Sequence, residues 1–291
     1  MNIGKNVGMV GIGLMGHGIA TNLQKHGHAL GLFEHPGNQP LDALKAGGAQ
    51  TFTALPALAA RSQVLILVLT GSAQVEAVLT GPGGLLEGLQ PGTLVIDCST
   101  SLPASTQRMA AAVAAAGGRF LDAPMTRTPK EAAEGRLNLL VGGDAALLDE
   151  ARPVLQCFAE NILHAGPVSA GHSMKLLHNY VSLGMVTLLA EAAACATKSG
   201  VAPEVFVDVL AKGGGGGIAL ERIKPFVLAG DVSGLRFSMA NAHKDLAYYG
   251  EMAGQASAAH AMADAVLATL ERGLAAKPDA LMPELAALLA R

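Results

Sequence analysis

Short stretches that are apolar at nearly every position recur along the first part of the chain, separated by longer stretches with helical periodicity. Strands covered on both faces have this continuous pattern, and connections of this length suit crossover helices. The pattern therefore predicts an α/β domain with a doubly wound, mostly parallel sheet. The expected strands are residues 7–11, 29–34, 64–69, 93–98, 119–124 and 137–143.

The pattern changes after about residue 165, where strand-like runs stop and helical stretches follow, broken at GGGGG (213–217) and at Gly230. We therefore expect two domains, residues 1–165 and residues 166–291, with the second all-helical. A stretch from Ser169 to about Ser199 is apolar on nearly all sides, which predicts a long, buried central helix that joins them.

Composition is that of a folded globular protein: of 291 residues, 51% are hydrophobic and only 15% are charged. The net charge of -3 argues against a nucleic-acid partner. No apolar run approaches the roughly 18 to 20 residues that span a membrane, so we expect a soluble, cytoplasmic protein. Cys98, Cys157 and Cys195 are expected to be buried thiols in a reducing compartment, and the histidine spacing predicts no metal site.

The clearest motif is GIGLMG, which follows the first expected strand and opens a helical stretch. Gly11 permits a tight turn, Gly13 lets the backbone approach a pyrophosphate, and Gly16 lets the helix pack on the strand. Leu14 and Met15 begin the helix, whose N-terminus would face the phosphates. The motif predicts a dinucleotide-binding Rossmann domain.

Glu34 stands at the end of the second expected strand, where a carboxylate can accept hydrogen bonds from the ribose hydroxyls of the dinucleotide. An acid there would repel a 2′-phosphate, and no basic cluster follows the strand. NAD is therefore favoured over NADP. The alternative is a glycine-rich turn followed by a solvent-exposed acid.

Five segments together resemble, in order and spacing, the signatures of the β-hydroxyacid dehydrogenase family, which includes 3-hydroxyisobutyrate dehydrogenase and tartronate semialdehyde reductase. The resemblance covers nearly the whole chain and implies a Rossmann domain and a helical domain joined by a long central helix. It also implies interconversion of a 3-hydroxy acid and its semialdehyde. The segments are GIGLMGHGIATNL, IDCSTSLP, DAPMTRTP with EGRLNLLVGGD, GHSMKLLHNY and LAGDVSGLRFSMANAHKDL.

Lys175, His178, Asn179 and Ser182 lie at positions i, i+3, i+4 and i+7 of the expected central helix, so they share one face. A lysine on a buried helix is costly unless it is paired, although a lysine in the first turn can also reach solvent. The resemblance implies that Lys175 is the catalytic acid or base and that Asn179 positions the substrate oxygen. Relatives often carry asparagine in place of His178, whose role could be packing.

The resemblance places three further residues at the cofactor. Thr100, at the end of the fourth expected strand, should lie near the nicotinamide, and Leu69 should lie near the middle of the cofactor. Lys244 matches a lysine that closes over the cofactor from the helical domain. Its alternative is an exposed helix lysine beside Asp245.

The loop DAPMTRTP departs from most relatives, which carry Ser-Gly-Gly where this chain has Thr126, Arg127 and Thr128. A similar Gly-Arg-Thr occurs in 3-sulfolactaldehyde reductase, a family member that reduces a sulfonate-bearing aldehyde. A guanidinium with flanking hydroxyls can bind a carboxylate or a sulfonate. The alternative is that Arg127 pairs with Glu131 or with another surface acid.

These expectations describe an NAD-dependent oxidoreductase that acts on a small acidic 3-hydroxy compound resembling 3-hydroxyisobutyrate. Reduction of a sulfonate-bearing aldehyde remains open as an alternative. A non-catalytic NAD-binding module would keep GIGLMG and Glu34 without needing Lys175 and Asn179 on one helix face. The apolar central helix and the Ala/Leu-rich C-terminal helices predict a homodimer or homotetramer.

Overall fold

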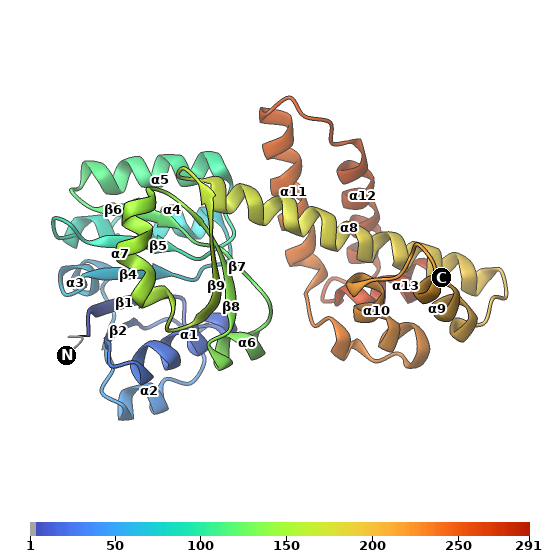
Figure 1. Cartoon of the computed structure of the whole chain (residues 1–291), viewed down its shortest axis with the longest axis horizontal. Helices are drawn as coiled ribbons and strands as arrows, with labels where there is room; N and C mark the ends of the chain where they lie inside the picture. Colours follow the sequence, from blue (N-terminus) through green and yellow to red (C-terminus); the bar gives the residue numbers. More distant parts are fainter. Residues whose placement is uncertain (1–3) are drawn as a thin grey trace. The chain divides into compact units, whose positions relative to one another are not determined.

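The computed structural model describes residues 4–291, with an α/β portion followed by a helical portion (Figure 1). The chain forms two compact units, Met1–Lys175 and Leu176–Arg291. This division falls inside the long helix α8 (Ala170–Lys198), shortly after the expected boundary between residues 165 and 166.

Among residues 4–291, nine strands form one sheet in the order β3-β2-β1-β4-β5-β6-β8-β7, with β9 paired to β8. The strands from β3 to β6 in this order are parallel to their neighbours, β8 is antiparallel to β6 and β7, and β9 is parallel to β8. The mostly parallel, Rossmann-type sheet is therefore confirmed. The strands are β1 (Asn6–Val10), β2 (Ala29–Phe33), β3 (Gln50–Phe52), β4 (Val64–Leu67), β5 (Leu94–Asp97), β6 (Arg119–Asp122), β7 (Met125–Thr126), β8 (Leu137–Gly142) and β9 (Ala159–Gly166).

Successive residues of a strand point to opposite faces of the sheet, and each face has its own core. In β4, Val64 and Ile66 belong to one buried cluster, whereas Leu65 and Leu67 belong to another. Helices α1, α2, α6 and α7 contribute to the first cluster, and α3, α4 and α5 contribute to the second. These helices are α1 (Leu14–Lys25), α2 (Asp42–Ala46), α3 (Leu55–Ala60), α4 (Ser72–Thr80), α5 (Pro103–Ala115), α6 (Pro129–Glu134) and α7 (Ala145–Leu155).

Strand β7 continues β6 along the same partner strand. Asp122 is opposite Gly142, and Thr126 is opposite Asn138, in one antiparallel register. The short interruption between β6 and β7 therefore leaves the chain direction unchanged. The loop that begins at Thr126 therefore lies at the edge of the sheet where the parallel strands end.

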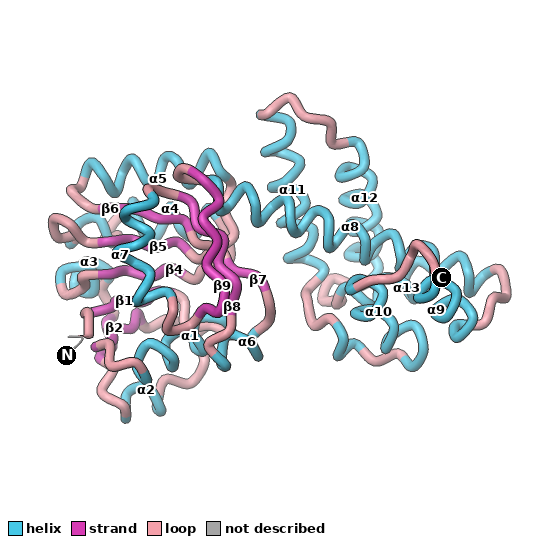
Figure 2. The backbone as a smooth tube through the Cα atoms, viewed as in Figure 1, coloured by secondary structure: helices cyan, strands magenta, loops and turns pink. Residues whose placement is uncertain are grey.

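The second unit is built from helices, which are drawn in cyan in Figure 2. They enclose a separate core that includes Leu183, Leu220, Leu246 and Leu270. Helices α9 (Pro203–Lys212), α10 (Ile218–Ala229), α11 (Met239–Gln255), α12 (Ala261–Ala276) and α13 (Leu285–Leu289) follow the part of α8 that belongs to this unit.

Two expectations need correction. By length and composition α8 is long and apolar enough to cross a membrane, although polar residues interrupt its apolar sequence. The core helix of a soluble protein meets the same criterion, and α8 carries Lys175 and His172 in its first turns. Cys98 and Cys157 are buried as expected, but Cys195 is exposed because it lies on an uncovered face of α8.

Candidate active site

The glycine motif forms the turn between β1 and the start of α1. Gly11 has φ +93°, a conformation that L side chains rarely adopt, and a Cβ on Gly16 would lie 1.9 Å from the Gly11 carbonyl oxygen. A Cβ on Gly13, in contrast, would meet nothing within 4 Å. Gly13 precedes Leu14 and Met15 and provides no side-chain cap for α1. The turn thus leaves open space beside an uncapped helix N-terminus, which fits the pyrophosphate of a dinucleotide.

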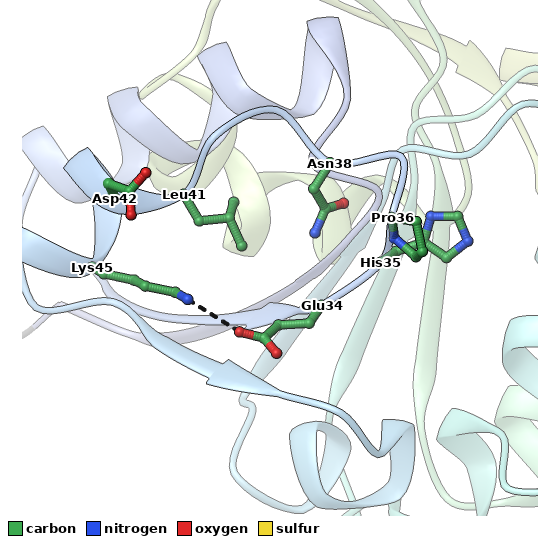
Figure 3. Close-up of a pocket in the computed structure, with 7 residues that line it drawn as sticks. All are labelled: Glu34, His35, Pro36, Asn38, Leu41, Asp42 and Lys45. Atoms are coloured by element: carbon green, nitrogen blue, oxygen red, sulfur yellow. Dashed lines mark hydrogen bonds and ion pairs between the residues drawn. The ribbon is translucent and has the colours of Figure 1, made fainter.

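Glu34 follows β2 directly and lines a cavity of about 400 Å³ (Figure 3). Lys45 Nζ lies 3.1 Å from Glu34 Oε1. Hydrogen bonds from Thr51 and then from Lys45 lower the pKa of Glu34, so this carboxyl is ionised at neutral pH. The rest of the cavity is lined by His35, Pro36, Asn38, Leu41 and Asp42.

Asn38 connects this cavity to the glycine turn. Its Nδ2 donates to the Phe33 carbonyl at 2.9 Å, and the Ile12 N–H donates to its Oδ1 at 3.3 Å. The side chain therefore fixes the loop after Glu34 against the motif that precedes α1. The open turn and the ionised acid together fit a dinucleotide with a free ribose.

Two expected cofactor residues follow β4 and β5, which are parallel neighbours. The Leu69 N–H donates to Ser99 Oγ at 2.9 Å, which ties the two loops together. Thr100 follows Ser99 and is half-buried. Because the two strands run in the same direction, both residues lie at the edge of the sheet where ligands of open α/β folds bind.

The loop after β7 holds Arg127 in a left-handed conformation with φ 82°, which favours glycine. Its Nη1 donates to Glu160 and to the Arg136 carbonyl oxygen. The structure thus shows the alternative considered from the sequence, a pairing of Arg127 with a surface acid, although that acid is Glu160 and not Glu131. Glu131 accepts from Thr128 Oγ1 at 2.5 Å and from the Thr128 N–H at 2.9 Å. This capping box begins α6 and lowers the pKa of Glu131.

Thr126 is held by a ladder of amide side chains across three strands. Asn138 Nδ2 on β8 donates to Thr126 Oγ1 at 3.1 Å, and Asn161 Nδ2 on β9 donates to Asn138 Oδ1 at 2.8 Å. No sequence pattern marks these asparagines, since their pairing depends on the register of β8 with its neighbours. In this ladder the Thr126 hydroxyl oxygen accepts a hydrogen bond, and the hydroxyl can still donate its own hydrogen.

Lys175 lies in the second turn of α8, where its Nζ donates to the Met125 carbonyl oxygen at 2.7 Å. That carbonyl directly precedes Thr126. The structure thus brings the expected acid or base next to the expected anion-binding loop. The side chain of Lys175 is half-buried.

A carboxylate from the sheet fixes the start of α8. Asp122 Oδ1 and Oδ2 accept from the backbone N–H groups of Ser169 and His172, each at 2.8 Å. Ser169 precedes the helix, as expected, but has φ 77°. Asp122 satisfies two of the free N–H groups at the helix start. It therefore fixes the position of the helix turn that carries Lys175.

His172 is a site residue that sequence reasoning missed. It is fully buried between Asp97 and Asp122, which are opposite each other in the register of β5 and β6. Its Nδ1 lies 2.8 Å from Thr106 Oγ1, and its Nε2 lies 3.2 Å from the Ser99 carbonyl oxygen. The sequence signal that could have identified this buried histidine is the pair of acids, Asp97 and Asp122, each at the end of one of two adjacent strands.

A second polar group lies within the helical unit. Asn179 Nδ2 donates to Asp245 Oδ2 at 2.6 Å, and His178 Nδ1 lies 3.0 Å from Asn179 Oδ1. Because a carboxylate only accepts, Asn179 must direct its amide nitrogen to Asp245, so His178 Nδ1 must carry a hydrogen. His178 therefore orients Asn179. Ser182 lies on the next turn of α8 and is half-buried.

Lys244 completes this group on α11. Its Nζ lies 2.9 Å from Asp245 Oδ1 and 5.2 Å from the centre of the Tyr248 ring. The contact between Lys244 and the buried Asp245 carboxylate is an ion pair. Lys244 is thus held beside Asp245, which also holds Asn179.

Two family models together match most of the chain. Residues 6–166 match the NAD binding domain of 6-phosphogluconate dehydrogenase. Residues 169–282 match the model described as NAD-binding of NADP-dependent 3-hydroxyisobutyrate dehydrogenase. The two matches correspond to the sheet-containing part of the chain and to its helical part.

Individual proteins show the same relationship. The chain is 34% identical over 244 residues to 2-(hydroxymethyl)glutarate dehydrogenase of Eubacterium barkeri, covering 82% of this chain and 79% of that protein. It is 34% identical over 251 residues to 3-sulfolactaldehyde reductase of Escherichia coli K12, covering 86% and 83%. The structure of Mycobacterium tuberculosis 3-hydroxyisobutyrate dehydrogenase with L-serine superposes with a TM-score of 0.88 at 26% identity, covering 99% and 100%.

Proposed function

This chain belongs to the 3-hydroxyisobutyrate dehydrogenase family of NAD-binding oxidoreductases, and from that premise we propose that it interconverts a small anionic 3-hydroxy acid and its semialdehyde. One observation carries the proposal: Lys175 Nζ donates to the Met125 carbonyl, directly before Thr126 and Arg127. A proton donor therefore contacts the backbone directly before two candidate anion-binding residues. This proximity suits a substrate with a hydroxyl group a few bonds from an acid group.

The proposed cofactor site uses the glycine turn and Glu34. The backbone at Gly11, Gly13, Leu14, Met15 and Gly16 would receive the pyrophosphate, and Glu34 would accept from the ribose. When bound, NAD would accept a hydride from the hydroxy acid, and NADH would donate one to the semialdehyde. Leu69, Thr100 and Lys244 are proposed as further contacts to the cofactor.

Lys175 handles the proton in this proposal. In the reduction direction its ammonium group donates a proton to the carbonyl oxygen of the substrate, and in the oxidation direction its amine accepts the hydroxyl proton. The hydrogen bond to the Met125 carbonyl restricts where Nζ can lie. Asn179, oriented by His178 and Asp245, holds the same substrate oxygen, and Ser182 is a further proposed contact.

The acid group of the substrate would bind at Arg127 and Thr126. Thr128 was expected to contribute its hydroxyl, but its hydrogen bond to Glu131 already uses that hydrogen. A sulfonate-bearing aldehyde is the second candidate substrate. It is favoured by the arginine in this loop and by the 34% identity to 3-sulfolactaldehyde reductase, because a guanidinium binds a sulfonate and a carboxylate through the same paired donors.

The test is steady-state kinetics with 3-hydroxyisobutyrate, C3 hydroxysulfonates and their uncharged analogues. We expect turnover only with the acidic compounds, and we expect Lys175→Ala to reduce kcat by about 10² to 10⁴, the usual contribution of general acid or base catalysis. NADH affinity, measured by fluorescence titration, should stay within about twofold. Near-normal turnover in that variant, or a preference for the uncharged analogues, would contradict the proposal.

A further inference from the structure

The guanidinium of Arg127 is fixed from one end. Its Nη1 donates both to Glu160, on β9, and to the carbonyl oxygen of Arg136, which directly precedes β8. One acceptor thus lies on β9 and the other directly before β8, and both are distant from Arg127 in sequence. Arg127 also has a left-handed backbone, a conformation whose cost is typical of functional positions.

The remaining donors of this guanidinium are available. An arginine has five N–H groups, of which Nη1 supplies two. Within residues 4–291 no protein acceptor takes a hydrogen bond from Nε or Nη2 of Arg127. The Nε and Nη2 hydrogens form the side edge of the planar group, which matches two oxygens of one carboxylate or sulfonate.

Thr126, which directly precedes Arg127 in the chain, has one donor available. Its Oγ1 accepts from Asn138, and in the part of the chain that the structure describes its hydroxyl hydrogen is donated to no protein group. Thr128 differs, because its hydroxyl donates to Glu131. Of the two threonines, only Thr126 can therefore donate to a ligand without breaking an existing contact.

The charges around Arg127 are balanced. Hydrogen bonding to Arg127 lowers the pKa of Glu160, so its carboxylate is ionised at neutral pH. Arg136 Nη1 lies 3.0 Å from Glu134 Oε2, and Arg136 Nε lies 3.9 Å from Glu160 Oε2. The two arginines and two glutamates cancel, so this cluster adds directed hydrogen bonds but no net positive charge to that of Lys175, whose Nζ donates to the Met125 carbonyl beside the loop.

We propose that Glu160 is a positioning residue that determines substrate specificity. Together with the Arg136 carbonyl, it holds Arg127 so that the Nε and Nη2 edge and the Thr126 hydroxyl receive a singly charged carboxylate or sulfonate. This inference rests on the proposed function. Glu160 itself does not contact the substrate, and its effect depends on Arg127.

The first experiment is a double-mutant cycle with Glu160→Ala, Arg127→Ala and the double variant. With the best acidic substrate, Glu160→Ala should raise KM roughly three- to thirtyfold, as expected for coupling between residues in contact, and change kcat by less than about twofold. In the Arg127→Ala background, Glu160→Ala should have no further effect. Glu134→Ala is the matched control, since Glu134 pairs with Arg136 alone, and its KM should stay at the wild-type value.

Several outcomes would overturn the role of Glu160. These are equal KM values for Glu160→Ala and Glu134→Ala, or a Glu160→Ala effect that persists without Arg127. A merely structural role would also weaken NADH binding and lower the Tm, whereas the positioning role leaves both unchanged. If the wild-type protein turns over no acidic compound, the proposed function itself fails.

The second experiment tests the charge of the acid group. The wild-type protein is assayed with matched C3 alcohols that carry a carboxylate, a sulfonate or a doubly charged phosphonate. We expect kcat/KM for the phosphonate to be at least about tenfold below the better monoanion, since dianion binding lacks compensating positive charge. Glu160→Gln, which keeps an acceptor but removes the charge, should narrow this gap. A wild-type preference for the phosphonate would overturn the inference, and the carboxylate-to-sulfonate ratio identifies the headgroup.

Discussion

Glu34 and Lys45 together set the charge that a bound cofactor would meet at its adenosine ribose. The ionised Glu34 repels a 2′-phosphate, but the Lys45 ammonium lies 3.1 Å from it and offsets part of this repulsion. No basic cluster follows β2 in the sequence, and Lys45, eleven positions after Glu34, is identified as its partner only by the fold. The two side chains meet across the cavity in Figure 3.

We expect the wild-type protein to bind NADH more tightly than NADPH. Glu34→Ala should reduce this preference by roughly ten- to hundredfold, the contribution of charged hydrogen bonds, whereas Lys45→Gln should increase it because the compensating cation is lost. Dissociation constants for both cofactors, and the ratio of their kcat/KM values, measure the effect.

Asp42→Asn is the control for this pair, since Asp42 lines the same cavity. It should change the two affinities by similar factors. Equal or reversed affinities in the wild-type protein would show that Glu34 does not select the cofactor.

The anion-binding loop shows how far residue-level reasoning reaches. DAPMTRTP identifies Arg127 as unusual, because the chain uses charged residues sparingly. Its partner could not be chosen from sequence: Glu131 is four residues away, but its carboxylate caps α6 through Thr128, and Glu160 is 33 residues away. The nearer acid is therefore occupied by its own hydrogen bonds to Thr128, and Arg127 pairs with the acid that is more distant in sequence.

Elements were predictable where their burial was uniform. All six expected strands exist, and β4 and β5 are buried at every position. Strands β3, β7 and β9 were missed. The first two have three and two residues, and β9 is mostly exposed, so none of them produces a continuous apolar run. The antiparallel pairing of β8 with β6 and β7 depends on tertiary contacts and has no sequence signal.

The link between α12 and α13 depends on a carboxylate that titrates. Glu284 Oε1 lies 2.7 Å from Lys277 Nζ, and Glu284 Oε2 accepts from the Leu281 N–H at 2.8 Å. Both contacts, the ion pair first, lower the pKa of Glu284. A folded-state pKa below the unfolded value of about 4.3 adds stability that is present above this value and is lost as pH falls through the folded pKa.

Glu284→Gln should therefore lower Tm at pH 7 by roughly 1 to 3 °C, as for a partly exposed ion pair, and should have a smaller effect near pH 3. Thermal unfolding followed by circular dichroism at both pH values measures the difference. Asp208→Asn removes a more exposed pair with Lys212 and should leave Tm unchanged. An effect of Glu284→Gln that is larger at pH 3 than at pH 7 would contradict the assigned direction.

At the scale of the whole molecule, α8 presents more apolar surface than its own unit covers. Leu177, Val181, Met185 and Leu188 are 42%, 57%, 44% and 65% exposed. Their spacing of four, four and three residues places them on one face of the helix. An apolar stripe of this length is typical of a protein–protein interface. We therefore expect this face of α8 to be the interface of the predicted homo-oligomer.

We therefore expect a dimer or tetramer at micromolar concentration, formed through this face of α8. Replacing Val181 and Leu188 together with aspartate should produce monomers, because buried charges without partners are costly at an interface. Light scattering coupled to size exclusion gives the mass directly. Val209→Asp is the control, since Val209 is 62% exposed on α9 and lies outside the stripe. A monomeric wild-type protein would refute the oligomer, and an unchanged oligomer in the double aspartate variant would place the interface on another surface.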